Sequence, residues 1–445
     1  MGSDGAVKVG LIGFGTIGTG VVKLLQRNAQ VIAQRLGFPL RLVRIADVDT
    51  ARDRRVDLSG IRFDADAWGL IRDPEVEIVI ELVGGYDVAK RFVLESIGAG
   101  KHVVTANKAL LALHGAEVFA AASQRGVDVA FEASVGGGIP ILRSIREGLA
   151  ANRIERLYGI LNGTTNYMLS EMEETGEPFE VVLKRAQELG YAEADPSVDV
   201  DGVDAAHKLA LLTAMAFGAE ITFKEIPTEG IRGLEPVDFE TAREFGYRVK
   251  LLGIAKSHRV EGGEEERLEV RVHPTMIPAT SLLASVDGAM NAVAVHGDAV
   301  GPTFYYGAGA GEMPTASAVV ADLMEIAREI RHGRAGRVAP LSTMPDHLER
   351  KPLLARGQLV GRVFLRFTAV DEPGVLSHIT GALAENGIGI ESLVQKGRGH
   401  SRESVPILVL THRAPEAAVV DAIESIDRLP DVTAPTLLVR IEEDL

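Results

Sequence analysis

Short apolar runs alternate with amphipathic stretches between Val7 and Phe131. The runs have the length and residue types of buried strands: Val7–Ile12, Leu40–Ala46, Ile78–Val83, His102–Thr105 and Val127–Phe131. Between them, apolar positions with a helical period predict helices, most clearly at Thr16–Asn28, Tyr86–Ala99 and Ala109–Arg125. Apolar strands that alternate with helices are typical of a parallel sheet covered on both faces. We therefore expect an α/β fold built on a doubly wound parallel sheet.

The pattern changes at the turn Gly136–Pro140. Beyond it, helical periods at Phe179–Leu189 and Val203–Phe217 mix with strand-like segments, which predicts an α+β domain. From Gln358 onward the order strand, helix, strand, strand, helix, strand indicates a small ferredoxin-like domain. The predicted organisation is a dinucleotide-binding Rossmann domain at 6–135, an α+β substrate and catalytic domain at 136–312, a helix returning to the Rossmann domain at 313–345, a linker at 346–357 and the ferredoxin-like domain at 358–445.

Charge and composition narrow the class of partner. The 445 residues include 47 Lys and Arg against 62 Asp and Glu, a net charge of −15, which argues against binding nucleic acid or an anionic membrane through a basic surface. The absence of Cys excludes disulfides, thiolate zinc sites and a cysteine nucleophile. No apolar run approaches the roughly 18 residues of a spanning helix, and the polar first residues do not form a signal peptide. A cytoplasmic protein that binds a small-molecule substrate is expected.

The first chemical motif is a glycine-rich turn at 13–18 that follows a strand and opens a helix. Its Gly-x-Gly-x-x-Gly spacing predicts dinucleotide binding through Gly13, Gly15, Thr16, Ile17 and Gly18 rather than a merely structural turn. Asp47, at the end of the second strand, is placed for the free ribose of NAD. Arg52, with Arg54 and Arg55, would instead accept the extra phosphate of NADP or form a solvated loop, so the choice of nicotinamide stays open.

Two lysines and an acidic segment are candidates for the chemistry. Lys108 follows Thr105 at the carboxyl end of a predicted parallel strand, where ligands of such sheets bind. Lys208 follows a segment rich in Asp and Glu, on a helix that is otherwise apolar, where it would donate a proton to a carbonyl. The alternatives are a solvated lysine at position 108 and an ordinary Asp204–Lys208 surface pair.

The turn that begins at Glu132 could enclose a hard cation with one carboxylate and several backbone carbonyls. On the residues alone, a flexible hinge between domains is the preferred interpretation. The His residues lack metal-ligand spacing, so a zinc site is not expected.

Six motifs together resemble the homoserine dehydrogenase family, in that family's order and over roughly residues 7–345. They are GFGTIG (13–18), TANK (105–108), FEASVGGGIP (131–140), GILNGTTNYML (159–169), EADPSVDVDGVDAAHK (193–208) and GAGAGEMPTA (307–316). The turn Asp371–Leu376 and the later Asn386-Gly387 resemble an ACT-type amino-acid-sensing domain, which many bacterial members carry.

The resemblance implies reversible NAD(P)H-dependent reduction of L-aspartate 4-semialdehyde to L-homoserine, in threonine and methionine biosynthesis. It implies that Lys208 is the proton donor and that Lys108 polarises the carbonyl. Further implied roles are substrate binding by Glu193, Asp199, Asp204 and Lys108, cofactor binding by Thr105, Lys108 and Gly309 beside the glycine motif, and sodium binding by Glu132, Val135, Gly137 and Ile139.

The ACT-like region implies regulation and assembly. Gly374 and Asn386 would hold an amino-acid effector, threonine by the pathway, and such domains pair through their sheets, so we expect a homo-oligomer, a dimer or tetramer. Two other functions compete with this one. The first is a non-catalytic sensor of dinucleotide and amino acid, which has no need of both lysines. The second is an ACT-bearing dehydrogenase of another precursor such as prephenate, whose two carboxylates the acidic segment would repel.

Overall fold

The computed structural model describes residues 5–220, 223–259, 266–333, 336, 338–397 and 404–445. They belong to two compact units. Unit 1 comprises Met1–Glu155, His207–Glu225 and Asn291–Arg350, and unit 2 comprises Arg156–Ala206, Ile226–Met290 and Lys351–Leu445. Each unit is built from segments that are far apart in the sequence.

Unit 1 contains a parallel sheet with the strand order β3-β2-β1-β4-β5-β6. The strands are β1 (Val7–Ile12), β2 (Leu40–Ala46), β3 (Arg62–Asp64), β4 (Ile78–Glu81), β5 (His102–Thr105) and β6 (Val129–Ala130). The order reverses between β1 and β4, so the carboxyl ends of these two central strands form the switch point at which such sheets bind ligands. The predicted Rossmann-type doubly wound sheet is confirmed.

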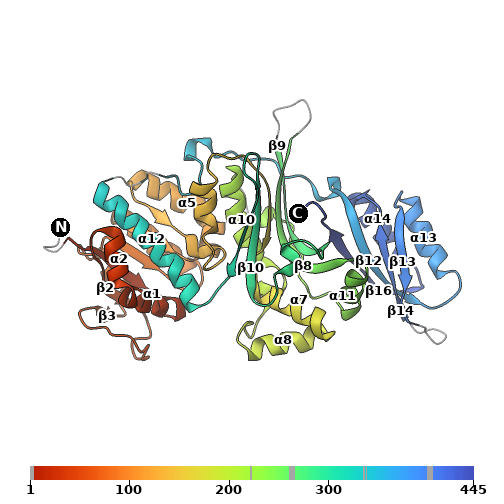
Figure 1. Ribbon diagram of the computed structural model, residues 1–445, viewed down its shortest axis with the longest axis horizontal. Coiled ribbons are helices and arrows are strands. Elements are labelled where there is room, and N and C mark those ends of the chain that lie inside the picture. Colours follow the sequence, from red (N-terminus) through yellow and green to blue (C-terminus); the bar gives the residue numbers. More distant parts are fainter. Residues whose placement is uncertain (1–4, 221–222, 260–265, 334–335, 337, 398–403) are drawn as a thin grey trace. The chain divides into compact units, whose positions relative to one another are not determined.

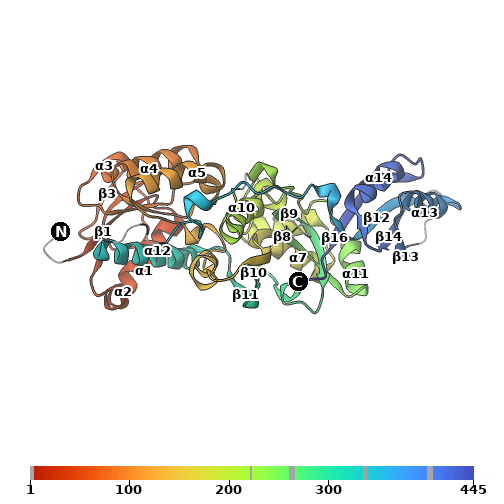
Figure 2. The same ribbon diagram turned by 90° about the horizontal axis from the view of Figure 1, so that it is seen from above.

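Helices cover both faces of this sheet (Figures 1 and 2). One face carries α3 (Ala67–Arg72), α4 (Asp87–Gly98) and α5 (Lys108–Arg125). The other carries α1 (Thr16–Arg27) and α12 (Glu312–His332), which pack side by side although nearly 300 residues separate them. The late helix α12 is thus an integral part of the first sheet's cover.

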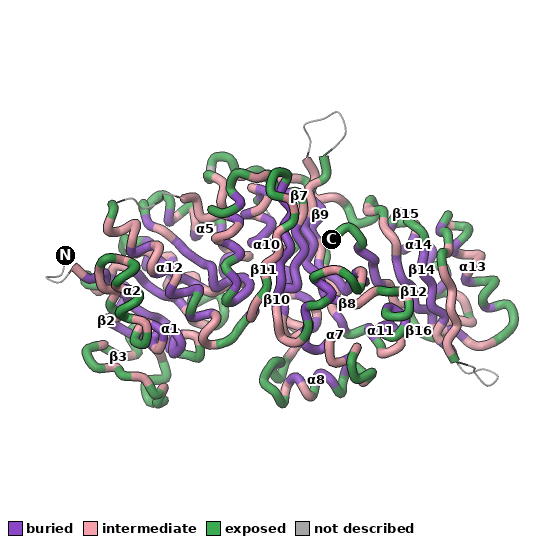
Figure 3. Tube along the Cα trace, viewed as in Figure 1, coloured by how far each residue is buried: buried purple, intermediate pink, exposed green. Residues whose placement is uncertain are grey.

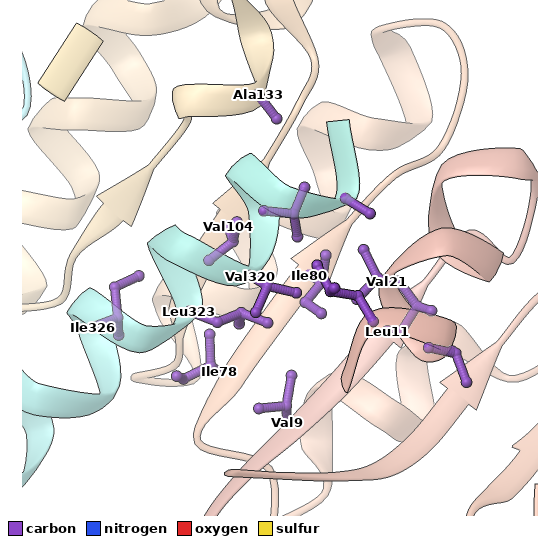
Figure 4. Packing of buried hydrophobic residues seen from close by; sticks show 14 of the residues in the cluster. Val9, Leu11, Val21, Ile78, Ile80, Val104, Ala133, Val320, Leu323 and Ile326 are labelled. Atoms are coloured by element: carbon purple, nitrogen blue, oxygen red, sulfur yellow. The ribbon is translucent and has the colours of Figure 1, made fainter. Parts of the chain in front are cut away.

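The core of unit 1 lies between the sheet and α12 (Figure 4). Val9, Ile78 and Val104 from three neighbouring strands face Val320 and Leu323 of the helix, and all five side chains are buried. Burying each such side chain contributes about 1.5–3 kcal/mol. This packing holds the carboxyl ends of the strands in fixed register, which is what a site at that edge requires.

Unit 2 contains a mixed sheet with the strand order β7-β8-β9-β16-β12-β14-β13. Its strands are β7 (Ile154–Ile160), β8 (Tyr247–Arg259), β9 (Glu266–Pro278), β12 (Val360–Val370), β13 (Ile390–Gln395), β14 (Ser404–Thr411) and β16 (Val432–Ile441). The strands β8 and β9 are buried over most of their length (Figure 3). Most pairs in the sheet are antiparallel, but β16 runs parallel to β9.

The strands β12, β13, β14 and β16 of unit 2 form the predicted ferredoxin-like domain with two helices. The order is β12, α13 (Val375–Glu385), β13, β14, α14 (Glu416–Ile426) and β16. Both helices pack on the sheet through Ile379, Leu383 and Val419, against strand residues such as Leu365 and Phe367. The predicted fold of this region is therefore confirmed.

One sheet joins this domain to the β8–β9 hairpin. Arg440 and Ile441 of β16 pair with Thr275 and Met276 of β9. The Arg440 side chain is buried and binds two carboxylates, Glu416 of α14 and Glu229. The domain is fixed to its neighbour by both backbone pairing and a buried ion cluster.

The remaining elements complete the two units. They are α2 (Ala29–Leu36), α6 (Ile141–Arg143), α7 (Gly163–Thr175), α8 (Phe179–Glu188), α9 (Ser197–Val200), α10 (Val203–Phe217), α11 (Pro236–Glu244), β10 (Met290–Gly297), β11 (Gly301–Ala308) and β15 (Ala414–Pro415). After α6 the chain continues as a π-helical turn, with Leu149 N donating to Ser144 O at 2.7 Å. Among the described residues, no helix combines the length and apolarity needed to cross a membrane.

Candidate functional site

In the glycine turn between β1 and α1, neighbouring backbone leaves no room for a side chain at Gly13 and Gly18, whereas the space at Gly15 is open. Gly13 has a φ of +95°, and a Cβ there would lie 2.5 Å from the Leu82 carbonyl oxygen. A Cβ on Gly18 would lie 2.3 Å from the Gly13 carbonyl oxygen, whereas nothing stands within 4 Å of a Cβ on Gly15. The helix α1 begins at Thr16 and presents its first-turn N–H groups there. The open surface over Gly15 fits a pyrophosphate.

Asp47 belongs to this turn. Its carboxylate accepts the N–H of Phe14 at 2.5 Å and lies 3.6 Å from the Arg54 guanidinium. Arg54 also donates to the Phe14 carbonyl at 2.9 Å and lies over the Phe14 ring, 4.8 Å from its centroid. Arg52, by contrast, is exposed. Of the three arginines in this loop, Arg54 is the one that contacts the glycine turn.

The carboxyl ends of β4 and β5 carry a chain of hydrogen bonds. Glu81 lies directly opposite Thr105, and its fully buried carboxylate accepts the Thr105 hydroxyl at 2.7 Å. The Thr105 hydroxyl accepts the N–H of Asn107 at 3.0 Å. Asn107 caps α5 by accepting the N–H of Leu110 at 3.0 Å. Lys108, the first residue of α5, is thereby held at the switch-point edge of the sheet.

Glu132 is buried and binds backbone. Its two carboxylate oxygens accept the N–H groups of Leu142 and Arg143 at 2.9 and 2.8 Å, while its own N–H donates to Asp322 at 2.8 Å. Burial raises the pKa of Glu132, although these hydrogen bonds oppose the shift. Burial and the nearby Glu132 raise the pKa of Asp322 to about 8.

The turn after Glu132 touches the segment that carries Gly309. A Cβ on Gly137 would lie 2.5 Å from the Gly309 carbonyl oxygen, and Gly138 N donates to the Ala308 carbonyl at 3.1 Å. Two backbones can approach this closely only without side chains. Gly137, predicted for the cation, and Gly309, predicted for the cofactor, are therefore neighbours. Among the described residues, no three His, Asp or Glu side chains form a metal-binding group.

The helix α10 carries Lys208 as a buried residue in unit 1. Its side chain is 8% exposed, and Leu209, Leu211 and Leu212 next to it are buried as well. Lysines are almost never this buried unless they are paired. This burial does not fit the alternative of a solvated surface pair.

In unit 2, Asn162 joins two of the predicted carboxylates. Its side-chain amide donates to Asp199 at 2.7 Å and to Asp204 at 2.9 Å, and its oxygen accepts the N–H of Thr165 at the start of α7. Glu193 lies on an exposed segment, where its carbonyl accepts from Gln187. Asp199 and Asp204 thus converge on one amide.

Three family profiles cover most of the chain. They are "Homoserine dehydrogenase, NAD binding domain" at residues 13–132, "Homoserine dehydrogenase" at 140–324 and "ACT domain" at 363–428. The curated homoserine dehydrogenase of Pseudomonas aeruginosa is 48% identical over 98% of this chain and 99% of its own length, and that of Neisseria gonorrhoeae is 45% identical over 98% of both. The chain belongs to the homoserine dehydrogenase family. It is an NAD(P)-dependent oxidoreductase of amino-acid biosynthesis, so the sensor and the dehydrogenase of another precursor are set aside.

Solved homoserine dehydrogenases have the same fold. The enzyme from Thiobacillus denitrificans is 49% identical, covers 98% of both chains and superposes with a TM-score of 0.90. The S. aureus enzyme at pH 7.5 is 30% identical over 98% of this chain and 99% of its own, with a TM-score of 0.74. A hyperthermophilic archaeal homoserine dehydrogenase in complex with NADPH is 25% identical over 72% of this chain and 97% of its own, with a TM-score of 0.60.

In the ACT domain, the two residues predicted to bind the effector lie at opposite ends of the helix α13. Gly374 precedes α13 with a φ of +103°, and Asn386 follows the same helix. The 11 residues of α13 span roughly 16 Å, and the Asn386 amide already donates to the Ala382 carbonyl at 2.9 Å. A single amino acid therefore does not contact both residues within one copy of the domain. The turn before α13 keeps Asp371 close to Gln395, at 3.0 Å.

Sequence reasoning missed several polar residues of this family member. Asn107 and Asn162 lie within recognised motifs and Glu81 lies in the predicted strand Ile78–Val83, but their partners are distant in sequence or belong to another strand. A carboxylate at the end of an otherwise apolar strand was the available signal for Glu81. For Asn162 the signal was an N-cap residue just before a helical segment.

Proposed function

We propose that this chain catalyses the reversible NAD(P)H-dependent reduction of L-aspartate 4-semialdehyde to L-homoserine. The observation that carries the proposal is the glycine turn, packed at Gly13 and Gly18 and open at Gly15, in a chain whose full length matches this family. The experiment is homoserine oxidation by the purified protein, followed through nicotinamide absorbance with NAD and NADP in parallel. No turnover with either nucleotide would contradict the proposal.

Lys208 and Lys108 are the proposed catalytic residues. A nicotinamide cofactor, when bound, would supply the hydride, and negative charge would develop on the substrate oxygen. A buried ammonium stabilises such a charge strongly because little water screens it, and it can also donate the proton. Lys208 has the burial for this role. Lys108 lies at the start of α5, where its ammonium would polarise the carbonyl.

Carboxylates bind the amino group of the substrate in this proposal. Asp199 and Asp204 are held by the amide of Asn162, which fixes their orientation, and their negative charge suits the ammonium of the substrate. Glu193 is proposed to complete the set. Its exposed position agrees with a role in substrate entry as well as in binding.

Both nicotinamides fit the proposed cofactor site of Gly13, Gly15, Thr16, Ile17, Gly18, Thr105, Lys108 and Gly309. The Asp47 carboxylate faces the glycine turn, as a ribose ligand would. Arg54 neutralises it and Arg52 is exposed nearby, so a 2′-phosphate has cationic partners as well. The ratio of kcat/KM with the two nucleotides measures the preference.

A sodium ion at the Glu132 turn is also proposed. The donor set of one carboxylate and the carbonyls of Val135, Gly137 and Ile139 consists of hard oxygens, which suits a hard cation. The Glu132 oxygens and the Ile139 carbonyl each accept an N–H, and each keeps a second lone pair. The residues therefore fit the ion, whose role would be to hold the turn against Gly309.

We propose that threonine is the effector, that the ACT domains pair side by side in a dimer or tetramer, and that the enzyme works in the cytoplasm. Support for the effector comes from the turn at Gly374, which has a positive φ and precedes α13, and from Asp371 in the same turn, which accepts a hydrogen bond from Gln395. The location follows from a role in amino-acid biosynthesis. Asn386 would contact an effector only across such a pair.

A further inference from the structure

Glu81 is an ionisable residue at a fully buried position of the parallel sheet. It is the last residue of β4, where its side chain is fully buried, and the three strand residues before it are apolar. Burial raises the pKa of its carboxyl to about 7, although hydrogen bonds from Thr105 and Val83 lower it. Burying a carboxyl group costs free energy of folding, so the role of Glu81 is to be sought in its hydrogen bonds.

The hydrogen bonds of Glu81 all lead toward the active-site edge. One oxygen accepts the N–H of Val83 at 2.6 Å, and the other accepts the Thr105 hydroxyl at 2.7 Å. The first contact shapes the turn after β4, and the second shapes the turn after β5. Glu81 therefore connects the turns that follow β4 and β5 at the carboxyl edge of the sheet.

Asn107 connects the same two turns from the other side. Its N–H donates to the Thr105 hydroxyl at 3.0 Å, and its side-chain amide donates to the Gly85 carbonyl at 2.6 Å. The Thr105 hydroxyl thus accepts from Asn107 and uses its single proton for Glu81. This arrangement requires an acceptor at Glu81, because a hydroxyl cannot donate to an amide N–H₂.

We propose that Glu81 is a positioning residue for Lys108, acting through Thr105 and Asn107 to fix the backbone from which the lysine side chain extends. The inference rests on the proposed function, in which Lys108 polarises the substrate carbonyl. Misplacement of a catalytic group by about 1 Å is enough to slow a reaction roughly 10²-fold. The carboxylate supplies what an amide of the same shape cannot, namely two acceptors for two donors that face it.

The test is Glu81→Gln in the full-length enzyme. A glutamine keeps the volume but offers one acceptor, so either Val83 or Thr105 faces an N–H₂ group and its turn shifts. We expect kcat for homoserine oxidation to fall roughly 10- to 100-fold. The dissociation constant of NADPH, measured calorimetrically without substrate, should change by a smaller factor than kcat, because the glycine turn is untouched and only Thr105 and Lys108 of the proposed cofactor site shift. Loss of kcat and nucleotide affinity by equal factors would overturn the proposal.

Thr105→Val provides a second test that does not depend on the folding of Glu81→Gln. It removes the hydroxyl that links Glu81 to Asn107. The kcat of the double variant should be little lower than that of the more impaired single variant, because both substitutions break the same series of hydrogen bonds. Independent, multiplicative losses would overturn the proposal. The matched control is Ser96→Ala, which removes another buried hydroxyl of the same unit, bonded to Phe92 at 2.7 Å. It should keep kcat while lowering the unfolding midpoint.

Lys108→Met separates this inference from the proposed function. If Lys108→Met keeps wild-type kcat, Lys108 has no catalytic role and the proposed function is wrong in that respect. If Lys108→Met loses activity while a folded Glu81→Gln keeps it, the positioning role of Glu81 is wrong and that of Lys108 stands. Loss in both variants, with NADPH affinity retained in Glu81→Gln, supports both.

Discussion

Arg440 offers a measurable test of how firmly the ACT domain is fixed within unit 2. It is 6% exposed and donates to the Glu416 carboxylate at 2.6 Å and to Glu229 at 2.9 Å. Arg440→Met keeps most of the apolar stem and removes the charge, so Glu416 loses its main partner. Breaking a buried ion pair on one side typically costs about 3–5 kcal/mol.

Two features of the structure lower the expected cost. Glu229 is 33% exposed, so water replaces much of what it loses. Glu416 keeps a second partner, Arg356, which binds the same carboxylate. We therefore expect Arg440→Met to reduce the free energy of unfolding of unit 2 by about 3 kcal/mol, the lower end of that range.

The assay is urea unfolding followed by far-UV circular dichroism, with hydrogen exchange of the β9 and β16 amides. Trp68 is the single tryptophan and belongs to unit 1, so its fluorescence reports on the other unit in the same experiment. Arg428→Met is the matched control, because Arg428 is 76% exposed and pairs with Glu424 on the surface of α14. It should cost no more than about 0.5 kcal/mol. Equal effects of the two variants would refute the reasoning.

The pH dependence gives the sign of the interaction. Burial alone would raise the pKa of Glu416, but hydrogen bonds from Arg440 and Arg356 bring it below the ordinary value of a glutamate. A carboxyl whose pKa is lower in the folded state stabilises the protein above its unfolded pKa, and this stability is lost as the pH falls through the folded value. The difference between wild type and Arg440→Met should therefore be full at neutral pH and shrink below pH 4.5. A difference that grows with acidity would contradict the assignment.

Three further outcomes are expected. Lys208→Ala should lower kcat roughly 10²-fold or more with NADPH affinity retained, whereas the exposed Lys184→Ala should change neither. Glu132→Gln should lose the sodium dependence of activity, because an amide N–H₂ opposes one of the backbone N–H groups; unchanged sodium dependence would remove Glu132 from the cation site. Threonine at millimolar concentration should inhibit and release heat on binding, and Gly374→Ala should abolish both through strain at a φ of +103°. Gly381→Ala on the same helix, with open space around it, should respond normally to threonine.

The regular parts of the fold were predictable because local sequence determines them. The strands Val7–Ile12, Leu40–Ala46 and His102–Thr105 match the structure residue for residue. The hairpin of β10 and β11 was not predicted, since Gly301 and Pro302 open its half-exposed second strand and obscure the alternation. The change from α-helix to π-helical turn after Arg143 was not predicted either, because apolar periodicity does not distinguish the two helix types.

Contacts between distant segments could not be predicted in the same way. The motif containing Asn162 was recognised, but nothing in the sequence indicates that its amide holds Asp199 and Asp204 together. Arg54 and the predicted Arg52 are equivalent by pattern, and only the fold brings one of them onto Phe14. The predicted domain boundaries, the site roles and the effector residues stay predictions.

The parallel pairing of β16 with β9 also has a consequence for the newly made chain. On the ribosome β9 is synthesised long before β16, so its edge at Thr275 and Met276 emerges with no strand to pair with. Exposed strand edges are templates for association between chains. Partial cover comes earlier, from Thr228, which bridges to Val272, and later from Leu353, which bridges to Leu268. Until Val432–Ile441 is synthesised, the β9 edge of the nascent protein has no β16 to pair with. We therefore expect folding during synthesis to depend on chaperones.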